Sequence, residues 1–441
     1  MAKEAGTPAP GDGRAGRRAA AGRPPGGVRQ LPLEHSILLT ATLCLLAAGA
    51  VMVYSASSPR SLLAGQGPAT GYLIKFVAYG AVGLVGMRLL ARHGLESVRR
   101  ATPALLLVSF GLLLAIKLPG VGRDINGARR WIGAGPVQFE PSELMKLALV
   151  LYAAHVLSSG PTTERRLRKM LRPLLLTTGA ACGLVVLQPD LGTAIILAFV
   201  VVAVMVAAGV PVRTLGKLAV AGVVLAGLFA VLEPYRRARL TAFLDPWAHA
   251  GTTGFQAVQG QIAIGSGGLL GVGPGQSVQK VFYLPEAHTD FILAVIGEEL
   301  GVMGVCVLLF LYGLIAYAGL RAAKAASGTY AALLAVGITS LIVGQATLNV
   351  FAVLGIAPLT GVPLPLVSYG STNLIVLLAG VGLLLNVAGG GAAHLRALGT
   401  PDAKPRRSGG GRDQDRDRGG GDGGARRAGS GRGRRAAGAR R

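Results

Sequence analysis

The residues best suited to chemistry in this chain lie in the string LPEAHTDF, directly before a long apolar run. Glu286, His288 and Asp290 bring two carboxylates and an imidazole close together in sequence. Acids, a base and cations on one side of a protein suit an anionic substrate that carries a hydroxyl group. Asp290 stands where the string meets the apolar run, so an ordinary helix N-cap also explains this carboxylate.

A second group of ionisable residues occupies the strings NGARRWI and EPSELMK. Glu143 and Lys146 are three residues apart and therefore share one face of a helix, for which Pro141 is a suitable first residue. A Glu and a Lys inside an apolar helix are costly unless they are paired or functional. The sequence predicts either a structural ion pair or a ligand-binding pair, with Arg129 and Arg130 as further candidates to bind an anion.

A third string, PLTGVPLPLVSYGSTN, interrupts the last apolar region with three prolines and two glycines. Irregular backbone at membrane depth is tolerated only where it is buried in protein or lines a cavity. Ser368, Tyr369 and Gly370 are therefore candidates for the wall of a binding cavity. Serine caps of the last helix are the alternative explanation for the hydroxyl groups.

The composition places these strings in a membrane protein. Apolar side chains make up 51% of the 441 residues, charged ones only 15%, and the mean hydropathy is +0.53. The net charge of +24 comes from Lys and Arg at the two ends and in the short connections, which is the positive-inside pattern, so nucleic acid is not an expected partner. Cys44, Cys182 and Cys306 lie in apolar stretches, where small buried hydrophobes are expected and a disulfide framework is not.

About ten segments are long and apolar enough to span a bilayer, for which roughly 20 residues are needed. They are His35–Ser55, Tyr72–Leu90, Ala101–Leu118, Glu143–Leu157, Arg172–Gln188, Leu191–Val210, Thr214–Leu232, Phe291–Leu320, Ala331–Gly355 and Val367–Val387. The fold class is therefore all-α: a polytopic membrane protein with a long extracytoplasmic loop, residues 233–290, before the eighth span. Basic connections place both termini in the cytoplasm, and the first span is expected to be a retained helix.

Two outward connections break the positive-inside rule. The arginines concerned are Arg123, Arg129, Arg130, Arg236, Arg237 and Arg239. Positive charge on the outer side suggests an anionic ligand there, whereas the alternative is contact with lipid headgroups. The long loop 233–290 is expected to form short surface helices with tight glycine turns. Residues 1–30 and 391–441 are expected to be disordered basic cytoplasmic tails that interact with membrane lipid.

Taken together, the strings resemble the FtsW/RodA (SEDS) family of bacterial cell-wall polymerases, over roughly residues 36–387. The matching strings, in order, are NGARRWI, EPSELMK, QPDLGTA, YRRARLTAFLDPW, GSGGLLGVG, LPEAHTDFILAVIGEELG and PLTGVPLPLVSYGS. PEAHTDF is more like the division branch, FtsW, than the elongation branch. The chain departs from the family's usual SYGGSS at Ser371 and the two residues after it.

The resemblance implies a peptidoglycan glycosyltransferase that joins lipid II units on the outer face of the cytoplasmic membrane, in septal synthesis during cell division. It implies a class B penicillin-binding transpeptidase and other division proteins as partners, and Asp290 as the catalytic aspartate. Arg129, Arg130 and Lys146 are candidates to neutralise the leaving pyrophosphate, as is a divalent cation, Mg²⁺ or Mn²⁺; no cofactor is certain.

Three alternatives remain open at the level of sequence. The same cavity and cations could serve a lipid II flippase, which needs access from both faces of the membrane. An elongation-type polymerase, similar to RodA, would share the chemistry and differ in its cellular role. A membrane scaffold of the division machinery, with the basic tails as docking arms, belongs to a different class.

Overall fold

The computed structural model describes most of the chain between its two ends. The described residues are 32–63, 69–125, 128–133, 138–158, 164–232, 234–281 and 283–390. The chain divides into two units, Met1–Gly399 and Thr400–Arg441, and every described residue belongs to the first. The predicted tails, residues 1–30 and 391–441, lie outside the described residues.

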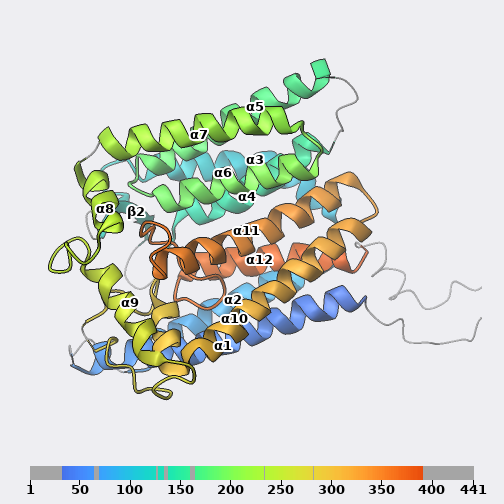
Figure 1. Cartoon of the computed structure of the whole chain (residues 1–441). Coiled ribbons are helices and arrows are strands. Elements are labelled where there is room, and N and C mark those ends of the chain that lie inside the picture. Colours follow the sequence, from blue (N-terminus) through green and yellow to red (C-terminus); the bar gives the residue numbers. More distant parts are fainter. Residues whose placement is uncertain are drawn as a thin grey trace, which may run out of the picture. The chain divides into compact units, whose positions relative to one another are not determined.

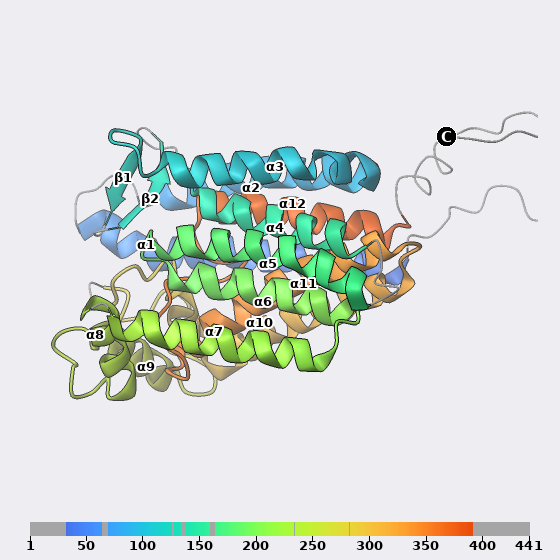
Figure 2. The same ribbon diagram turned by 90° about the horizontal axis from the view of Figure 1, so that it is seen from above.

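Ten of the twelve helices in the described part run alongside one another (Figures 1 and 2). They are α1 (Leu33–Leu63), α2 (Gly71–Arg92), α3 (Leu95–Ala115), α4 (Pro141–Leu157), α5 (Glu164–Val186), α6 (Leu191–Ala207), α7 (Val212–Leu232), α10 (Ile292–Ala325), α11 (Thr329–Val353) and α12 (Ser371–Ala388). Seven are long and apolar enough to cross a membrane, and α6 is a shorter apolar helix. The predicted multi-pass helical architecture is confirmed.

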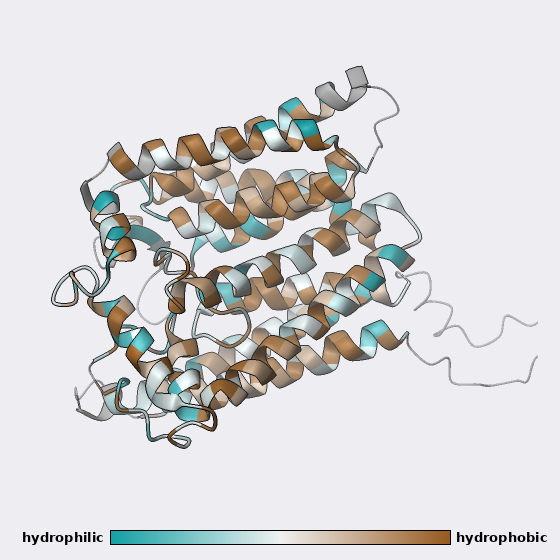
Figure 3. Ribbon diagram, in the orientation of Figure 1, coloured by the Kyte–Doolittle hydropathy of each residue, from teal (hydrophilic) through white to brown (hydrophobic). Residues whose placement is uncertain are grey.

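Apolar residues run along the whole length of the bundle helices (Figure 3), and many apolar side chains are exposed on the outside of the bundle. On α7, for example, Val220, Val223 and Leu228 are all exposed. An exposed apolar surface of this extent is unfavourable in water and is expected where lipid chains are the solvent. The exposed apolar surface therefore supports the conclusion, drawn from the composition, that the bundle lies in a membrane.

Close packing of α12 against α2 forms one side of the core. A Cβ atom added at Gly382 would collide with the backbone of Met87, and one added at Gly83 would lie 2.5 Å from Leu378 Cδ1. Small residues of this kind let membrane helices approach closely. At one end of the bundle, Arg321 of α10 pairs with Glu34 of α1 (3.1 Å). This pair places the end of α10 beside the start of α1.

The other end of the bundle carries the extended and irregular segments (Figures 1 and 2). The strands β1 (Gly122–Ile125) and β2 (Ala128–Ile132) form an antiparallel hairpin, which the sequence analysis did not predict because both strands are very short. Arg123 pairs with Trp131 and Asp124 with Arg129, so Arg130 is an extra residue at a bulge. The long loop contains α8 (Pro234–Leu244) and α9 (Phe255–Gly267), the short helices that its composition predicts.

A break in α10 separates its first turns from the rest of the helix. Gly301 has φ of 65°, and the backbones of Leu269 and Gly271 approach it so closely that a Cβ atom would not fit. Val302 N donates to Gly268 O (3.0 Å), and Val272 N donates to Glu298 O (2.9 Å). Only glycine combines this conformation with this contact, and the segment Ile292–Leu300 is thereby joined to the loop.

Side chains reinforce this junction. The buried Lys280 Nζ lies 2.7 Å from Glu299 Oε1 and 2.9 Å from Ser55 Oγ, which itself donates to Glu299 (2.6 Å). Glu298 accepts hydrogen bonds from Ser277 Oγ and from Val278 N (3.0 Å). The loop is therefore fixed to the start of α10, where the residues of LPEAHTDF end.

Candidate functional site

Asp290 does not cap a helix in the structure. The N-cap of α10 is Phe291, and no side chain donates or accepts a capping hydrogen bond there. The Asp290 carboxylate accepts a hydrogen bond from Thr289 Oγ1 (3.1 Å). Its Oδ2 atom faces Gly361, where an added Cβ atom would lie 4.0 Å away. The N-cap explanation is wrong, and the carboxylate lies against the proline-rich interruption.

The backbone of Asp290 is fixed by a buried side chain of α11. Asn349 Nδ2 donates to Asp290 O (2.7 Å) and to Val362 O (2.8 Å), and the Asn349 side chain is buried. One amide group therefore joins the end of the long loop to the proline-rich interruption. The position of the carboxylate relative to Gly361 is set by this contact.

The environment of Asp290 raises the pKa of its carboxyl to about 6. Burial is the largest cause, and the negative charge of Glu286 adds to it, while the hydrogen bond from Thr289 and the charge of Arg239 act in the opposite direction. A carboxylate with this pKa remains ionised at neutral pH and is a stronger base than an ordinary aspartate. General bases work best when their pKa lies near the working pH.

The interruption, residues 354–370, has its backbone satisfied by neighbouring side chains. Tyr312 donates to Pro365 O (2.5 Å), and Gln345 Nε2 donates to Pro363 O (3.0 Å). Ser368 Oγ accepts a hydrogen bond from Leu364 N (2.8 Å). The irregular backbone is thus buried in protein, which is the condition under which non-helical backbone is tolerated inside a membrane. Ser368, a predicted binding residue, stabilises the turn that it lies in.

The predicted residues His288 and Tyr369 belong to an aromatic cluster with Tyr72. Ring centroids are 4.4 Å apart for Tyr72 and His288, 5.1 Å for Tyr72 and Tyr369, and 5.7 Å for His288 and Tyr369. Tyr369 N also donates to His288 O (2.9 Å). His288 is buried, so its geometry supports a role in holding the loop against Gly370, the N-cap residue of α12.

Glu286 shapes the turn before Asp290. Its φ of 54° is unusual for a residue other than glycine, and its carbonyl accepts hydrogen bonds from Thr289 N (3.0 Å) and Thr289 Oγ1 (2.9 Å). The Glu286 side chain also influences the pKa of Asp290. Glu286, His288 and Asp290 are therefore brought together, as the sequence predicts, but they have different structural roles.

Glu143 and Lys146 form the predicted ion pair. Lys146 Nζ lies 2.7 Å from Glu143 Oε2, and both side chains are buried. Asn373 of α12 donates to Glu143 Oε2 (3.1 Å), and Lys146 donates to Gln345 Oε1 (3.2 Å). Because Gln345 also binds Pro363, the pair is connected to the same interruption that faces Asp290.

The two predicted arginines of the hairpin have different surroundings. Arg130 donates to Gln188 O (2.9 Å) and to Pro189 O, and lies 4.0 Å from the Asp190 carboxylate. Arg129 is exposed, with a long contact of 3.9 Å to Asp124. Arg130 therefore holds the turn before α6, whereas the Arg129 guanidinium is accessible to a ligand from solvent.

The turn bound by Arg130 lies against the interruption. Asp190 caps α6 by accepting a hydrogen bond from Thr193 N (3.0 Å). At Gly192 an added Cβ atom would lie 2.8 Å from Thr360 O and 2.5 Å from Val362 Cγ2. The start of α6 therefore packs against the segment that faces Asp290, and only a glycine permits this approach.

Glu140, the N-cap residue of α4, was not among the candidate residues predicted from the sequence. Burial and the negative charges of Glu143 and Asp190 raise the pKa of Glu140 to about 8, and Ser142 Oγ donates to its carboxylate (2.9 Å). At neutral pH this group is mostly protonated and can donate a hydrogen bond. Its position in the string EPSE, three residues before Glu143, is the sequence feature that could have identified it as a candidate.

No group of three or more His, Cys, Asp or Glu side chains that could hold a metal ion lies within the described residues. The described residues do not fit a resident divalent cation, and we derive no step through one.

The geometry can be compared with known proteins. A family model described as "Cell cycle protein", covering FtsW, RodA and SpoVE, matches residues 35–390. The chain is 37% identical to stage V sporulation protein E of Bacillus subtilis over 355 residues, which cover 80% of this chain and 96% of the relative. It is 40% identical to a probable peptidoglycan glycosyltransferase FtsW of Thioalkalivibrio sulfidiphilus, covering 79% and 88% of the two chains.

Solved structures show the same fold. A peptidoglycan synthase complex, whose structure is described as coordinating polymerization and crosslinking, contains a chain with a TM-score of 0.66 and 32% identity, covering 80% of this chain and 96% of that one. The rod shape determining protein RodA of Thermus thermophilus matches with a TM-score of 0.58 and 32% identity, covering 80% and 95%.

Proposed function

We propose, because the chain belongs to the FtsW, RodA and SpoVE family of cell cycle proteins, that it polymerises lipid II with Asp290 as the base. The chain is a membrane-embedded peptidoglycan glycosyltransferase. The observation that carries the role of Asp290 is the position of its carboxylate. It lies outside the capping position of α10, against Gly361, with a pKa raised to about 6.

In the proposed reaction, Asp290 accepts the proton of the acceptor sugar hydroxyl as the hydroxyl oxygen attacks the anomeric carbon of the donor. The new glycosidic bond forms as the bond from that carbon to the lipid pyrophosphate breaks, and the electron pair leaves with the phosphate oxygen. A single displacement at an α-linked donor inverts the centre to a β-linkage. One positioned carboxylate is enough for this reaction, whereas a retaining mechanism uses two.

The leaving pyrophosphate needs neutralisation of charge more than it needs a proton. Among the predicted cations, Arg129 is exposed, whereas Lys146 is paired with Glu143 and Arg130 binds the turn at Gln188. We assign Arg129 to the approach of the anionic substrate. Lys146 is assigned to the wall of the site, through its contact with Gln345.

We propose that the chain acts at the division septum, with both termini in the cytoplasm, and that a class B penicillin-binding transpeptidase is its partner. The PEAHTDF string and the FtsW relatives support the division role. The similarity to a chain of a peptidoglycan synthase complex supports the partner.

The decisive experiment is polymerisation of purified lipid II by the protein reconstituted in liposomes, with and without the transpeptidase. Glycan strands and free lipid pyrophosphate are expected from the wild type and not from Asp290→Ala. Movement of labelled lipid II across the bilayer without glycan would instead identify a flippase. The assay is repeated with EDTA, Mg²⁺ and Mn²⁺ to measure any metal requirement directly.

A further inference from the structure

Buried side chains of α11 hold the proline-rich interruption in place. Gln345 and Asn349 are four residues apart, so they lie on one face of the helix, about one turn from each other. Their exposed fractions are 0% and 2%. Gln345 Nε2 donates to Pro363 O (3.0 Å), and Asn349 Nδ2 donates to Val362 O (2.8 Å). Two successive carbonyls of the interruption are therefore fixed by α11.

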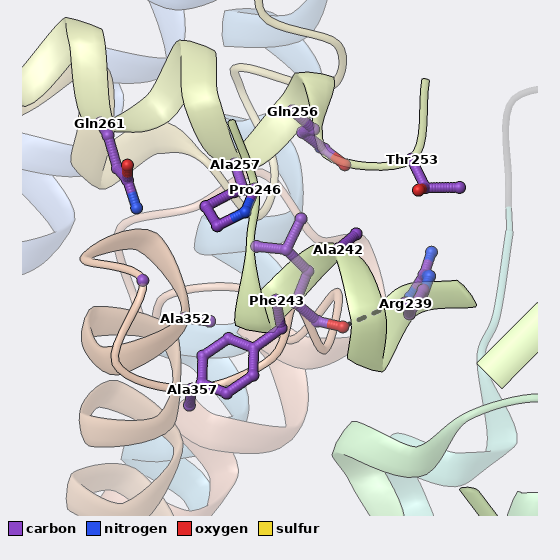
Figure 4. Close-up of a pocket in the computed structure, with 12 residues that line it drawn as sticks. Arg239, Ala242, Phe243, Pro246, Thr253, Gln256, Ala257, Gln261, Ala352 and Ala357 are labelled. Atoms are coloured by element: carbon purple, nitrogen blue, oxygen red, sulfur yellow. Dashed lines mark hydrogen bonds between the residues drawn. The ribbon is translucent and has the colours of Figure 1, made fainter. Parts of the chain in front are cut away.

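The long loop holds the same interruption at an earlier residue. Arg239 of α8 donates to Leu359 O (3.4 Å), as the dashed line in Figure 4 shows. Gly361 lies between this contact and the contacts with α11, and a Cβ atom added to it would lie 4.0 Å from Asp290 Oδ2. The place of Gly361 against the carboxylate therefore depends on hydrogen-bond donors before and after it in the chain.

Gln345 differs from Asn349 in what sets the orientation of its amide. The Oε1 atom of Gln345 accepts a hydrogen bond from Lys146 Nζ (3.2 Å). Because an ammonium group only donates, the oxygen of Gln345 must face Lys146, and the amide NH2 group is left for Pro363. The Oδ1 atom of Asn349 is buried and has no hydrogen-bond partner among the described residues. The ion pair of Glu143 and Lys146 therefore decides which group Gln345 presents to the interruption.

These contacts act on Asp290 by position, since α11 and the interruption, residues 354–370, carry no charged side chain. The charged groups that influence the pKa of the Asp290 carboxyl are Glu286 and Arg239, and burial is the largest cause of the rise of this pKa to about 6. A shift of Gly361 away from the carboxylate would open it to water. The pKa would then fall toward the ordinary value of aspartate, and the carboxylate would be a weaker base.

We propose that Gln345 is a positioning residue of the proposed reaction. It couples the ion pair of α4 to the interruption, and so sets how closely Gly361 approaches the Asp290 carboxylate. The inference rests on the proposed function, since it takes Asp290 as the base. Gln345 acts through the backbone of the interruption and not by contact with a reacting atom.

Gln345→Met tests the proposal, because methionine has a similar length and cannot donate to Pro363 O. Infrared difference spectra between a protein and the same protein carrying Asp290→Asn follow the titration of the Asp290 carboxyl directly. We expect Gln345→Met to lower the midpoint of this titration by about one pH unit, and the midpoint of kcat/KM against pH to fall with it. The misplaced base should lower kcat about tenfold, while KM for lipid II stays close to that of wild type.

Gln345→Asn is a milder second variant, which decides the question if the methionine variant does not fold. It retains an amide, but its side chain is one methylene shorter and cannot reach both partners, so a shift in the same direction is expected. Thr339→Val is the matched control. Thr339 is buried in the same helix, and its hydroxyl has no hydrogen-bond partner among the described residues. The control is expected to titrate and to turn over as wild type does.

The coupling to the ion pair needs its own test. In the double variant Glu143→Gln, Lys146→Met, no cation orients the amide of Gln345. Adding Gln345→Met to this background should therefore lower the titration midpoint by less than it does in wild type, because coupled positions are not additive. An equal decrease in both backgrounds would overturn the coupling to the pair.

The outcomes separate this inference from the proposed function. A wild-type titration midpoint and a wild-type kcat in the folded Gln345 variants would overturn the positioning role. A lower melting temperature as the sole change would identify a packing role and would overturn it as well. The infrared titration needs no glycan synthesis, so it decides how Asp290 is positioned even if the wild type makes no glycan. That last result would contradict the proposed function alone.

Discussion

Asn349 donates from one side-chain nitrogen to the carbonyls of both Asp290 (2.7 Å) and Val362 (2.8 Å). Replacing it by Leu would leave two buried carbonyls without this donor, at a cost of roughly 1–3 kcal/mol for each unsatisfied group. We expect Asn349→Leu to lower both the melting temperature and kcat. Thr347→Val, on the exposed face of the same helix, is expected to change neither. A wild-type kcat in Asn349→Leu would show that the hydrogen bond from Asn349 is not needed to position Asp290.

Substitution of the carboxylate itself tests the base. Asp290→Asn keeps the shape of the side chain and removes its basicity, so polymerisation should fall by about 10²- to 10⁴-fold. The variant should still insert in the membrane and bind its transpeptidase partner. Asp245→Asn is the control, because Asp245 is exposed in the same loop and caps a turn at Ala248. Glycan strands at the wild-type rate from Asp290→Asn would refute the assignment.

The pH dependence of the wild type follows from the pKa of Asp290. The base must be ionised, so kcat/KM should rise with pH through about 6 and level off above it. The pKa is raised in the folded protein, so ionisation of Asp290 lowers the stability of the fold as pH increases from the unfolded pKa through the folded one. Asp290→Asn should therefore melt at a higher temperature than wild type at pH 7. Below the unfolded pKa, where the wild-type carboxyl is protonated, the two melting temperatures should converge.

The buried pair of Glu143 and Lys146 can be tested for a role beyond packing. Removing one partner, as in Lys146→Met, leaves a buried charge and should cost about 3–5 kcal/mol of stability. The double variant Glu143→Gln, Lys146→Met removes both charges and should recover most of that stability. We expect its polymerase activity to remain low, because the Lys146 cation near Gln345 would still be missing. Full recovery of activity would identify a purely structural pair.

The buried contact between Lys280 and Glu299 fixes the long loop to the start of α10. Lys280→Met should destabilise the protein by about 3–5 kcal/mol, because the Glu299 charge stays buried without its partner. Limited proteolysis should then cut the loop near Gly273 faster than in wild type. The exposed pair of Glu96 and Arg100 provides the control, since Arg100→Met should cost less than about 1 kcal/mol. Equal proteolysis of the two variants would contradict this role.

The arrangement of the helices is predictable from the sequence because lipid imposes a length and an apolar composition on every span. The predicted segment Leu191–Val210, for instance, corresponds to α6 (Leu191–Ala207). The break at Gly301 is not predictable in this way. The break depends on a close contact with Gly271. Gly271 lies in the long loop and meets Gly301 only in the folded chain.

The candidate site is only partly predictable for a similar reason. The proximity of Glu143 to Lys146 follows from helical spacing, and the structure confirms the ion pair. The roles of Ser368 and Arg130 do not follow from sequence, because each is decided by the backbone atoms it meets, at Leu364 and Gln188. Residue type can suggest a hydrogen bond to the main chain, but it does not identify which distant backbone atom the side chain will meet.

The bulge in the short hairpin has a consequence for the effect of deleting one residue from β2. β2 has five residues against four in β1, and Arg130 is the one without a partner across the pair. Deleting Arg130 would give a regular hairpin, so the strands themselves would tolerate the deletion. The same event would remove the contacts that hold Gln188 and Pro189. A deletion that the hairpin tolerates would therefore release the turn at Gln188 and Pro189, before α6. The resulting loss of activity would arise at that turn, while the strands themselves would remain regular.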